Sequence, residues 1–335
     1  MDVAVITPTY NRAHLLPQSI DSVIAQTTPA RIEMAVIDDG STDDTADMMR
    51  PYIDKYGAPG GKVHIQYIQL EKQGVVTARN TGIERTNAPY IALLDSDDYW
   101  DPRKLELQLK AIRSDPHVGV VHTSFRYVDD QSRFIDDRVQ GHRLNNPCVG
   151  WCIDAMLNEF LVIFSSVLIR RAVVEQVSAA EPHGLPFDPR WTNAQDYDLM
   201  LRAARVSRFV YVPEPLTLYR FHDQHGAMGN LKRAFGFHCR VQMDFVARWG
   251  RDAGVTEADA TRRAVAFLYK RAESAFWQRD MDNCTALCDL AAELSFDDDR
   301  FVKLKHKAAR PRWMYRVKDR MDRMLGKSSS PGAAQ

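Results

Sequence analysis

Four short apolar runs in the first hundred positions constrain the fold of this chain more than any other feature. They cover residues 3–7, 33–37, 63–68 and 90–94, and valine and isoleucine are frequent in them. Runs of this length and composition are typical of β-strands. The segments between them carry apolar residues at helical spacing, so strands and helices alternate. This alternation predicts an α/β domain with a mainly parallel sheet and helices on both of its faces.

Acidic clusters follow two of these predicted strands. The segment "IDDGS" lies at 37–41, and "LLDSDD" lies at 93–98. Ligands of such sheets bind outside the carboxyl ends of the strands, so the clusters predict a binding site at this edge. The first strand leads into Pro-Thr-Tyr-Asn-Arg, and the chain has neither GxGxxG nor GxxxxGK[ST]. This argues against a Rossmann dehydrogenase and a P-loop enzyme.

The cluster at 95–98 has the spacing D-x-D-D. Alternate residues of an extended segment face the same side, so Asp95 and Asp97 can converge. Two convergent carboxylates with room for phosphate oxygens form an oxygen-ligand site for Mg²⁺ or Mn²⁺. The alternative is an acid-rich turn that binds no ligand.

The pattern changes after residue 117. Residues 118–130, 160–174 and 208–222 are predicted to be strands, and 194–206 are predicted to form an amphipathic helix. From 231 onward the chain has few strand signals and is predicted to be helical.

We therefore expect a globular domain over 1–230, followed by a helical region over 231–325. Within the first domain, the change of pattern separates two halves, 1–117 and 118–230. The last ten residues, 326–335, are small and polar, and we expect them to be disordered.

The global charge gives no reason to expect a nucleic-acid partner, because 44 basic residues balance 44 acidic ones. The basic residues are concentrated at the end, where residues 310–327 read as a basic amphipathic helix. Such a helix can contact an anionic membrane. The alternative is a terminal helix that packs on its own domain.

The start of the chain has no basic region followed by a long apolar run, and no apolar stretch approaches 18 residues. The five cysteines form no CxxC pair, which fits reduced structural thiols. We therefore expect a cytoplasmic protein. The alternative prediction is a protein that lies peripherally on the inner face of the membrane.

Four motifs occur in order at the expected strand ends: "VITPTYNR", "VIDDGSTDDT", "GVVTARNTGI" and "YIALLDSDD". Together they resemble the family 2 glycosyltransferases, which are inverting enzymes of the GT-A fold. The resemblance runs from about residue 3 to about residue 225. It implies the fold of the nucleotide-diphospho-sugar transferases, a Rossmann-like and mainly parallel sheet.

The resemblance also implies that 1–117 is the half that binds the nucleotide sugar and that 118–230 is the half that holds the acceptor and the catalytic base. The first half would contain a donor pocket. In it, the Tyr10 ring would lie against the base, and Asp39 would accept a hydrogen bond from a uracil N–H. For Tyr10, the alternative is a packing role. The residues that the resemblance places around the nucleotide are Pro8, Thr9, Tyr10, Asp39, Arg79 and Asp95, with Asn80 nearby.

A metal bound next to the diphosphate is implied as well. Its ligands would be Asp97, Asp95 and His222, with His225 as the alternative to the histidine. Imidazole favours Mn²⁺ over Mg²⁺. The residues expected to support this site are Asp98 and Arg220, the latter near the diphosphate.

The family's catalytic base corresponds to Asp196 in "NAQDYDLMLR". The usual Glu-Asp pair reads Gln195-Asp196 here, which removes a neighbouring charge that could raise the pKa of the base. Asp198 is the rival for this role. The alternative is a purely structural role, in which Asp196 caps the helix.

These observations predict a metal-dependent inverting glycosyltransferase that uses a nucleotide-diphosphate sugar, such as a UDP-sugar. The acceptor would be a hydroxyl of a glycan or a lipid-linked saccharide in cell-surface polysaccharide synthesis. The alternatives are a sugar-phosphate nucleotidyltransferase and a non-catalytic nucleotide-sugar binding protein.

Overall fold

The computed structural model describes residues 1–135, 147–159, 162–221 and 230–310. The chain divides into two compact units, Met1–Ala227 and Met228–Gln335. Among the described residues, no helix combines the length and the apolar character needed to cross a membrane. The basic segment at 310–327 lies almost wholly outside the described residues, and so does the tail at 326–335.

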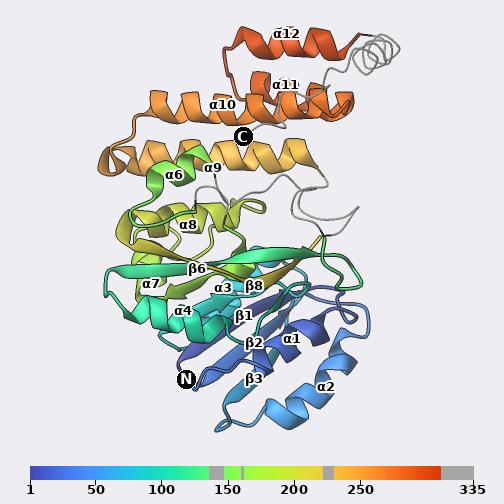
Figure 1. Ribbon diagram of the computed structural model, residues 1–335, viewed down its shortest axis with the longest axis vertical. Helices are drawn as coiled ribbons and strands as arrows, with labels where there is room; N and C mark the ends of the chain where they lie inside the picture. The colour runs from blue at the N-terminus through green and yellow to red at the C-terminus, as the bar shows by residue number, and fades with distance from the viewer. Residues whose placement is uncertain (136–146, 160–161, 222–229, 311–335) are drawn as a thin grey trace. The chain divides into compact units, whose positions relative to one another are not determined.

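The first unit is built on one eight-stranded sheet, which Figure 1 shows running through it. The strand order is β3-β2-β1-β4-β7-β6-β8-β5. Strands β3, β2, β1 and β4 are parallel, β6 is parallel to β8, and β5 and β7 are antiparallel to their neighbours. The strands are β1 (Val3–Thr9), β2 (Ile32–Asp38), β3 (Val63–Gln69), β4 (Tyr90–Leu93), β5 (Tyr99–Trp100), β6 (Val118–Val128), β7 (Leu168–Arg170) and β8 (Arg208–Arg220).

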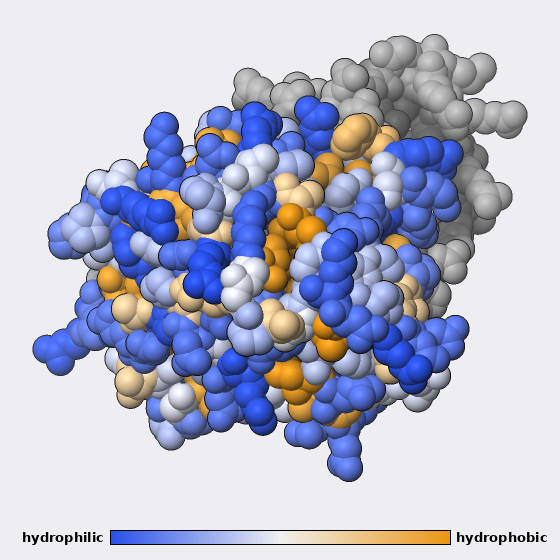
Figure 2. Space-filling view, turned by 90° about the horizontal axis from the view of Figure 1, so that it is seen from below, coloured by the Kyte–Doolittle hydropathy of each residue, from blue (hydrophilic) through white to orange (hydrophobic). Residues whose placement is uncertain are grey.

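Helices connect these strands as the alternating pattern predicts. Hydrophobic residues are few and scattered on the face shown in Figure 2, which is mostly hydrophilic. The helices of this unit are α1 (Leu16–Ile24), α2 (Thr45–Tyr56), α3 (Val75–Glu84), α4 (Lys104–Arg113), α6 (Ile153–Asn158), η1 (Phe164–Ser166), α7 (Arg171–Ala179) and α8 (Gln195–Val206).

The alternating side chains of β1 pack against helices on both faces of the sheet. Val3 and Val5 join a buried cluster that includes Leu16 of α1 and residues of α2 and α4. Ile6 points to the opposite face, where α3 crosses the sheet at Gly82. Burying both faces explains why the first strand is a continuous apolar run.

The close approach of α3 gives a stability prediction. A Cβ atom on Gly82 would lie 2.5 Å from Cγ2 of Ile6 and 3.2 Å from Cγ1 of Ile37. We expect Gly82→Val to lower the free energy of unfolding by about 1–3 kcal/mol, because the helix must move off the sheet. Chemical denaturation measures this change. Glu84→Ala on the exposed side of the same helix is the control and should change the value by less than about 0.5 kcal/mol. Equal stability of the two variants would contradict the packing.

One strand expectation was wrong. The segment at 160–174 was expected to form a long strand, but among its described residues, 162–174, only Leu168–Arg170 pairs in the sheet. A 3-10 turn precedes this short strand, and helix α7 begins at Arg171. The central residues of this run, 164–169, are all buried, and periodicity alone does not separate a buried strand from a buried helix.

The second unit contains four helices among its described residues: α9 (Leu231–Ala253), α10 (Glu257–Trp277), α11 (Met281–Glu293) and α12 (Asp299–Ala308). Their apolar faces share one core, which includes Leu268, Leu287 and Phe301. Thr256 and Asp259 form a capping box that starts α10. All five cysteines of the chain are buried and free.

Candidate active site

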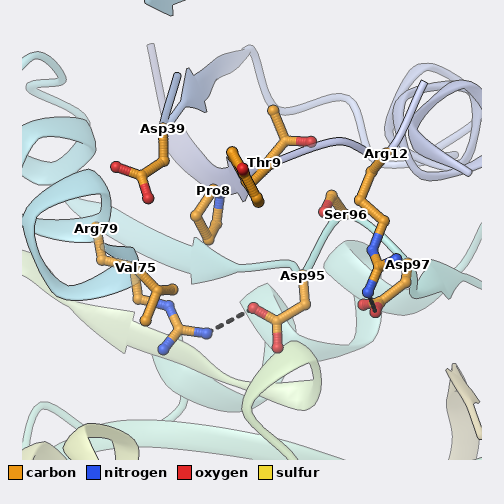
Figure 3. A pocket seen from close by; sticks show the side chains of 10 residues that line it. Pro8, Thr9, Arg12, Asp39, Val75, Arg79, Asp95, Ser96 and Asp97 are labelled. Atoms are coloured by element: carbon orange, nitrogen blue, oxygen red, sulfur yellow. Dashed lines mark hydrogen bonds and ion pairs between the residues drawn. The ribbon is translucent and has the colours of Figure 1, made fainter. Parts of the chain in front are cut away.

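A cleft opens at the carboxyl ends of β1, β2 and β4, the edge that the acidic clusters predicted. Figure 3 shows its lining, to which the turn after β1, the start of α3 and the loop after β4 contribute. The lining residues are Pro8, Thr9, Tyr10, Arg12, Asp39, Val75, Arg79, Asp95, Ser96 and Asp97.

Asp95 is held by a buried arginine. Nη2 of Arg79 lies 2.5 Å from Oδ1 of Asp95. The guanidinium of Arg79 also faces the rings of Phe164 and Phe187, whose centroids are 4.7 and 5.8 Å away. Its Nη1 is buried and has no hydrogen-bond partner within the described residues. Arg79 is therefore fixed in place with one donor group unused, and Asp95 is oriented from the floor of the cleft.

Asp97 faces a second arginine, which sequence reasoning did not single out. Nη2 of Arg12 lies 3.7 Å from Oδ2 of Asp97, and both side chains remain partly exposed. Only the position of Arg12, directly after the first strand and its Pro-Thr-Tyr-Asn segment, could have signalled this role. No group of three or more His, Cys, Asp or Glu suited to a metal is found within the described ranges.

Asp98 points away from the cleft into the core. It accepts hydrogen bonds from the Ser165 hydroxyl at 2.5 Å and from the Arg220 backbone N–H at 2.9 Å. Burial, together with the charges of Asp97 and Asp95, raises its pKa well above the ordinary carboxyl value. Asp98 thus stabilises the loop that carries the other two acids.

The Arg220 guanidinium is also buried, behind the acidic loop. It donates to the carbonyl oxygens of Asp97 at 3.0 Å and Asp129 at 2.6 Å. It further donates to the side chains of Gln18 at 2.7 Å and Ser132 at 3.2 Å. The guanidinium of Arg220 thus donates its hydrogen bonds to protein acceptors, and these bonds position the backbone of Asp97. His222 and His225 lie outside the described residues.

Asp39 supports the rim on the other side of the cleft. Its carboxylate accepts backbone N–H groups from Gln73 at 2.7 Å and from Gly74 at 2.9 Å. These bonds fix the loop that leads into α3. In the same region, Nζ of Lys72 lies 3.5 Å from the centroid of the Tyr10 ring. Tyr10 is therefore not buried in packing, but presents its ring at the cleft under a cation.

Thr9 contributes a second unused polar group. It is the last residue of β1 and is 3% exposed. Its hydroxyl is buried and has no hydrogen-bond partner within the described ranges. Buried polar groups are normally paired, so an unpaired hydroxyl in a cleft marks a place for a ligand or a water molecule.

Asp196 comes from helix α8, in the second half of the first unit. It stands in the first turn of α8, after Ala194 in the left-handed conformation, and it accepts the Tyr197 backbone N–H at 2.8 Å. Burial raises the pKa of Asp196, the charge of Arg79 lowers it, and the charge of Asp95 raises it. These electrostatic effects show that Asp196 lies close to the Arg79–Asp95 pair.

Its rival Asp198 is engaged elsewhere. Asp198 is 1% exposed and pairs with Arg202, whose Nη2 is 2.6 Å from Oδ2 of Asp198. The same Nη2 donates to the Pro186 carbonyl oxygen at 2.6 Å. The geometry thus separates the two acids of α8: Asp196 lies near the cleft, and Asp198 belongs to a buried ion pair.

Asn80 joins the two halves of the unit. Its amide donates to the Phe187 carbonyl oxygen and accepts the Phe187 N–H, both at 2.9 Å. This pair of hydrogen bonds joins residues that are 107 positions apart in the sequence, and it holds the segment before Asp196 against α3. Asn80 therefore positions the segment before Asp196, although it does not line the cleft.

The family model described as glycosyl transferase family 2 matches residues 4–176, just over half of the chain. The chain belongs to glycosyl transferase family 2. The match covers every strand that carries cleft residues, and it confirms the resemblance drawn from the four ordered motifs. The recognised segment ends before α8, so the assignment of Asp196 rests on the structure and on the resemblance.

This family 2 chain is similar to parts of longer proteins. An uncharacterized glycosyltransferase of Rickettsia bellii is 38% identical over 134 residues, covering 40% of this chain and 18% of the relative. Chondroitin synthase of Escherichia coli is 24% identical over 253 residues, covering 74% of this chain and 33% of the synthase. This chain thus spans less than two thirds of the length of either relative.

Solved structures confirm the GT-A fold. Residues 1–349 of S. aureus TarS, solved in complex with UDP-GlcNAc, have a TM-score of 0.62 at 16% identity, over 98% of this chain and 93% of TarS. The mannosyltransferase PcManGT of Pyrobaculum calidifontis, solved with GDP-Man and Mn²⁺, has a TM-score of 0.56 at 18% identity, over 92% and 79%.

Proposed function

We propose that this family 2 protein is a metal-dependent inverting glycosyltransferase that moves a sugar from a nucleotide diphosphate to an acceptor hydroxyl. One observation carries the proposal. Thr9 and Arg79, each with a buried polar group that has no partner within the described residues, line the same cleft as the paired acids Asp95 and Asp97. A carboxylate with a raised pKa, Asp196, lies beside them. This combination of groups is the one expected in the active site of a group-transfer enzyme.

A nucleotide fits the side of the cleft that Asp39 and Tyr10 form. Asp39 has lone pairs beyond those that accept the Gln73 and Gly74 N–H groups, and these can meet a base N–H. The Tyr10 ring offers a surface for stacking. We propose a uridine nucleotide; the UDP-GlcNAc in the TarS structure supports this choice, whereas the GDP-Man of PcManGT is the alternative.

The donor set fits a divalent metal. Asp95 and Asp97 supply carboxylate oxygens at the cleft, and Mg²⁺ and Mn²⁺ accept one or two protein carboxylates completed by phosphate oxygens. The Mn²⁺ in the PcManGT structure supports this assignment. When bound, such a cation would neutralise charge on the diphosphate. We propose that Arg220 serves it indirectly, by positioning the backbone of Asp97.

The chemical step then assigns one role to Asp196. Its carboxylate accepts the proton of an acceptor hydroxyl as that oxygen attacks the anomeric carbon. The new carbon–oxygen bond forms on the face opposite the diphosphate, and the bond to the diphosphate oxygen breaks and leaves its electron pair there. A single displacement of this kind inverts the anomeric configuration.

The acceptor is proposed to be a hydroxyl of a glycan or a lipid-linked saccharide, in surface polysaccharide synthesis. The name of the E. coli relative, chondroitin synthase, supports a polysaccharide product. Asp196 lies on α8, in the half of the unit that follows β6, so we propose that the acceptor approaches from the side of that helix.

Donor hydrolysis over a panel of nucleotide sugars with MnCl₂ tests the proposal without an acceptor. We expect slow release of nucleoside diphosphate from one or a few donors, and none without a divalent cation. A sugar-phosphate nucleotidyltransferase would instead release pyrophosphate from a nucleoside triphosphate and a sugar phosphate. Failure of every donor, in binding as well as in hydrolysis, would favour a protein that has lost the activity.

The role of Asp196 predicts a pH dependence. A base must be ionised, so kcat/KM should fall as the pH drops through the raised pKa of Asp196, at a pH above the ordinary carboxyl value of 3.8. The Arg79 charge lowers this pKa, so Arg79→Gln should move the acidic limb to higher pH. Arg79→Lys keeps the positive charge, so the acidic fall of kcat/KM should return to the pH at which the unaltered chain shows it. The measurement is kcat/KM against pH at saturating metal, and an unchanged limb in Arg79→Gln would contradict the assignment.

A further inference from the structure

The turn after β1 directs Arg12 into the cleft. Asn11 has a φ of 51°, in the left-handed region that few side chains adopt. Its backbone N–H donates to the Ser41 hydroxyl at 2.8 Å, and its side-chain oxygen accepts the Thr42 N–H at 2.8 Å. The residue after Arg12 donates its N–H to Asp43 at 3.1 Å. Both neighbours of Arg12 are thus tied to the loop after β2, and the side chain projects toward Asp97 (Figure 3).

The two arginine–carboxylate pairs of the cleft differ in kind. Arg79 is 2.5 Å from Asp95, its side chain is 5% exposed, and aromatic rings hold it. Arg12 is 3.7 Å from Asp97, and its side chain is 34% exposed. Partly exposed pairs at such distances contribute little energy and exchange partners readily. Arg79 is a fixed part of the site, whereas Arg12 can leave its partner at little cost.

We propose that Arg12 is an exchangeable counter-ion of this site. It neutralises Asp97 before a divalent cation binds, and it turns to the donor diphosphate once Asp97 has bound the cation. The inference rests on the proposed function. A guanidinium suits both partners, because its planar donors match carboxylate and phosphate oxygens alike and it keeps its charge at all relevant pH values.

Such a residue should affect two equilibria in opposite directions. Without Arg12, the cation no longer competes with that guanidinium for Asp97, so MnCl₂ alone should bind about 2- to 5-fold more tightly. The diphosphate loses a charge-assisted contact, so UDP should bind about tenfold or more weakly at saturating Mn²⁺. A residue that only stabilised the turn would weaken both interactions.

Direct binding measurements test this inference separately from activity. Electron paramagnetic resonance reports free Mn²⁺ during titration of the full chain, and calorimetry then measures UDP binding at saturating Mn²⁺. The variants are Arg12→Gln, Asp97→Ala and the control Arg85→Gln. Arg85 is exposed, follows α3 and does not line the cleft; the nearest lining residue of that helix, Arg79, is six residues away, roughly 9 Å at 1.5 Å per residue.

The outcomes separate the two proposals. Tighter Mn²⁺ binding and weaker UDP binding in Arg12→Gln, with Arg85→Gln unchanged, would support the inference. Mn²⁺ binding that depends on Asp97 but is unchanged or weakened by Arg12→Gln would overturn it and leave the proposed function intact. Unaltered UDP affinity would overturn the diphosphate contact. Absence of Mn²⁺ binding in the unaltered chain and in Arg12→Gln would overturn the metal site itself, and this inference with it.

Discussion

Asp196→Asn is expected to lower the rate of sugar transfer about 10²- to 10⁴-fold, because the amide cannot accept the acceptor's proton. Its oxygen can still accept the Tyr197 N–H, so the start of α8 should keep its shape. Donor binding should change little, since the base acts on the acceptor. Steady-state transfer and calorimetric donor binding check the two halves of this expectation.

Asp198→Asn is the matched comparison for the same helix. It removes the nearer of two carboxylate partners of the buried Arg202, the other being Glu181 with Oε1 3.8 Å from Nε, so we expect a loss of about 3 kcal/mol in the free energy of unfolding, the lower end of the range for a broken buried pair. Asp196→Asn should be inactive but stable, and Asp198→Asn should be unstable. Near-normal turnover of Asp196→Asn would show that the base lies elsewhere.

Asp97→Ala should lower metal-dependent transfer about 10²- to 10³-fold, since a bound cation supplies several kcal/mol of charge stabilisation on the leaving group. The same change should remove the Mn²⁺ dependence of UDP binding. Isothermal calorimetry with UDP, with and without MnCl₂, measures this second effect directly.

Asp54→Ala is the control for the loss of one negative charge. Asp54 is exposed on α2 and does not line the cleft, so both UDP binding and transfer should stay at the level of the unaltered chain. If Asp97→Ala retained Mn²⁺-dependent UDP binding, the metal would have to be held by other groups, and the proposal for Asp97 would fail.

The sequence by itself determined the architecture of the first half. Buried strands between amphipathic helices have one stable arrangement, a parallel sheet, and its chemistry must lie at the carboxyl ends of the strands. Asp39, Asp95 and Asp97 could therefore be placed at one cleft from local patterns alone. The secondary structure of the run at 160–174 could not be predicted from such a pattern. A continuous apolar run shows neither the two-residue period of a strand nor the 3.6-residue period of a helix.

Only the tertiary structure decided which charged groups face each other. Arg12 and Asp97 are 85 positions apart, Asn80 and Phe187 are 107 apart, and the separation of Arg220 from Asp97 exceeds both. No local pattern encodes such pairings, because they depend on how the two halves of the sheet pack. The same packing places Asp198 in a buried ion pair and Asp196 beside the cleft, although the two acids lie two residues apart on one helix. A short helical separation turns the side chains in different directions, and only the surrounding fold determines which of them meets water and substrate.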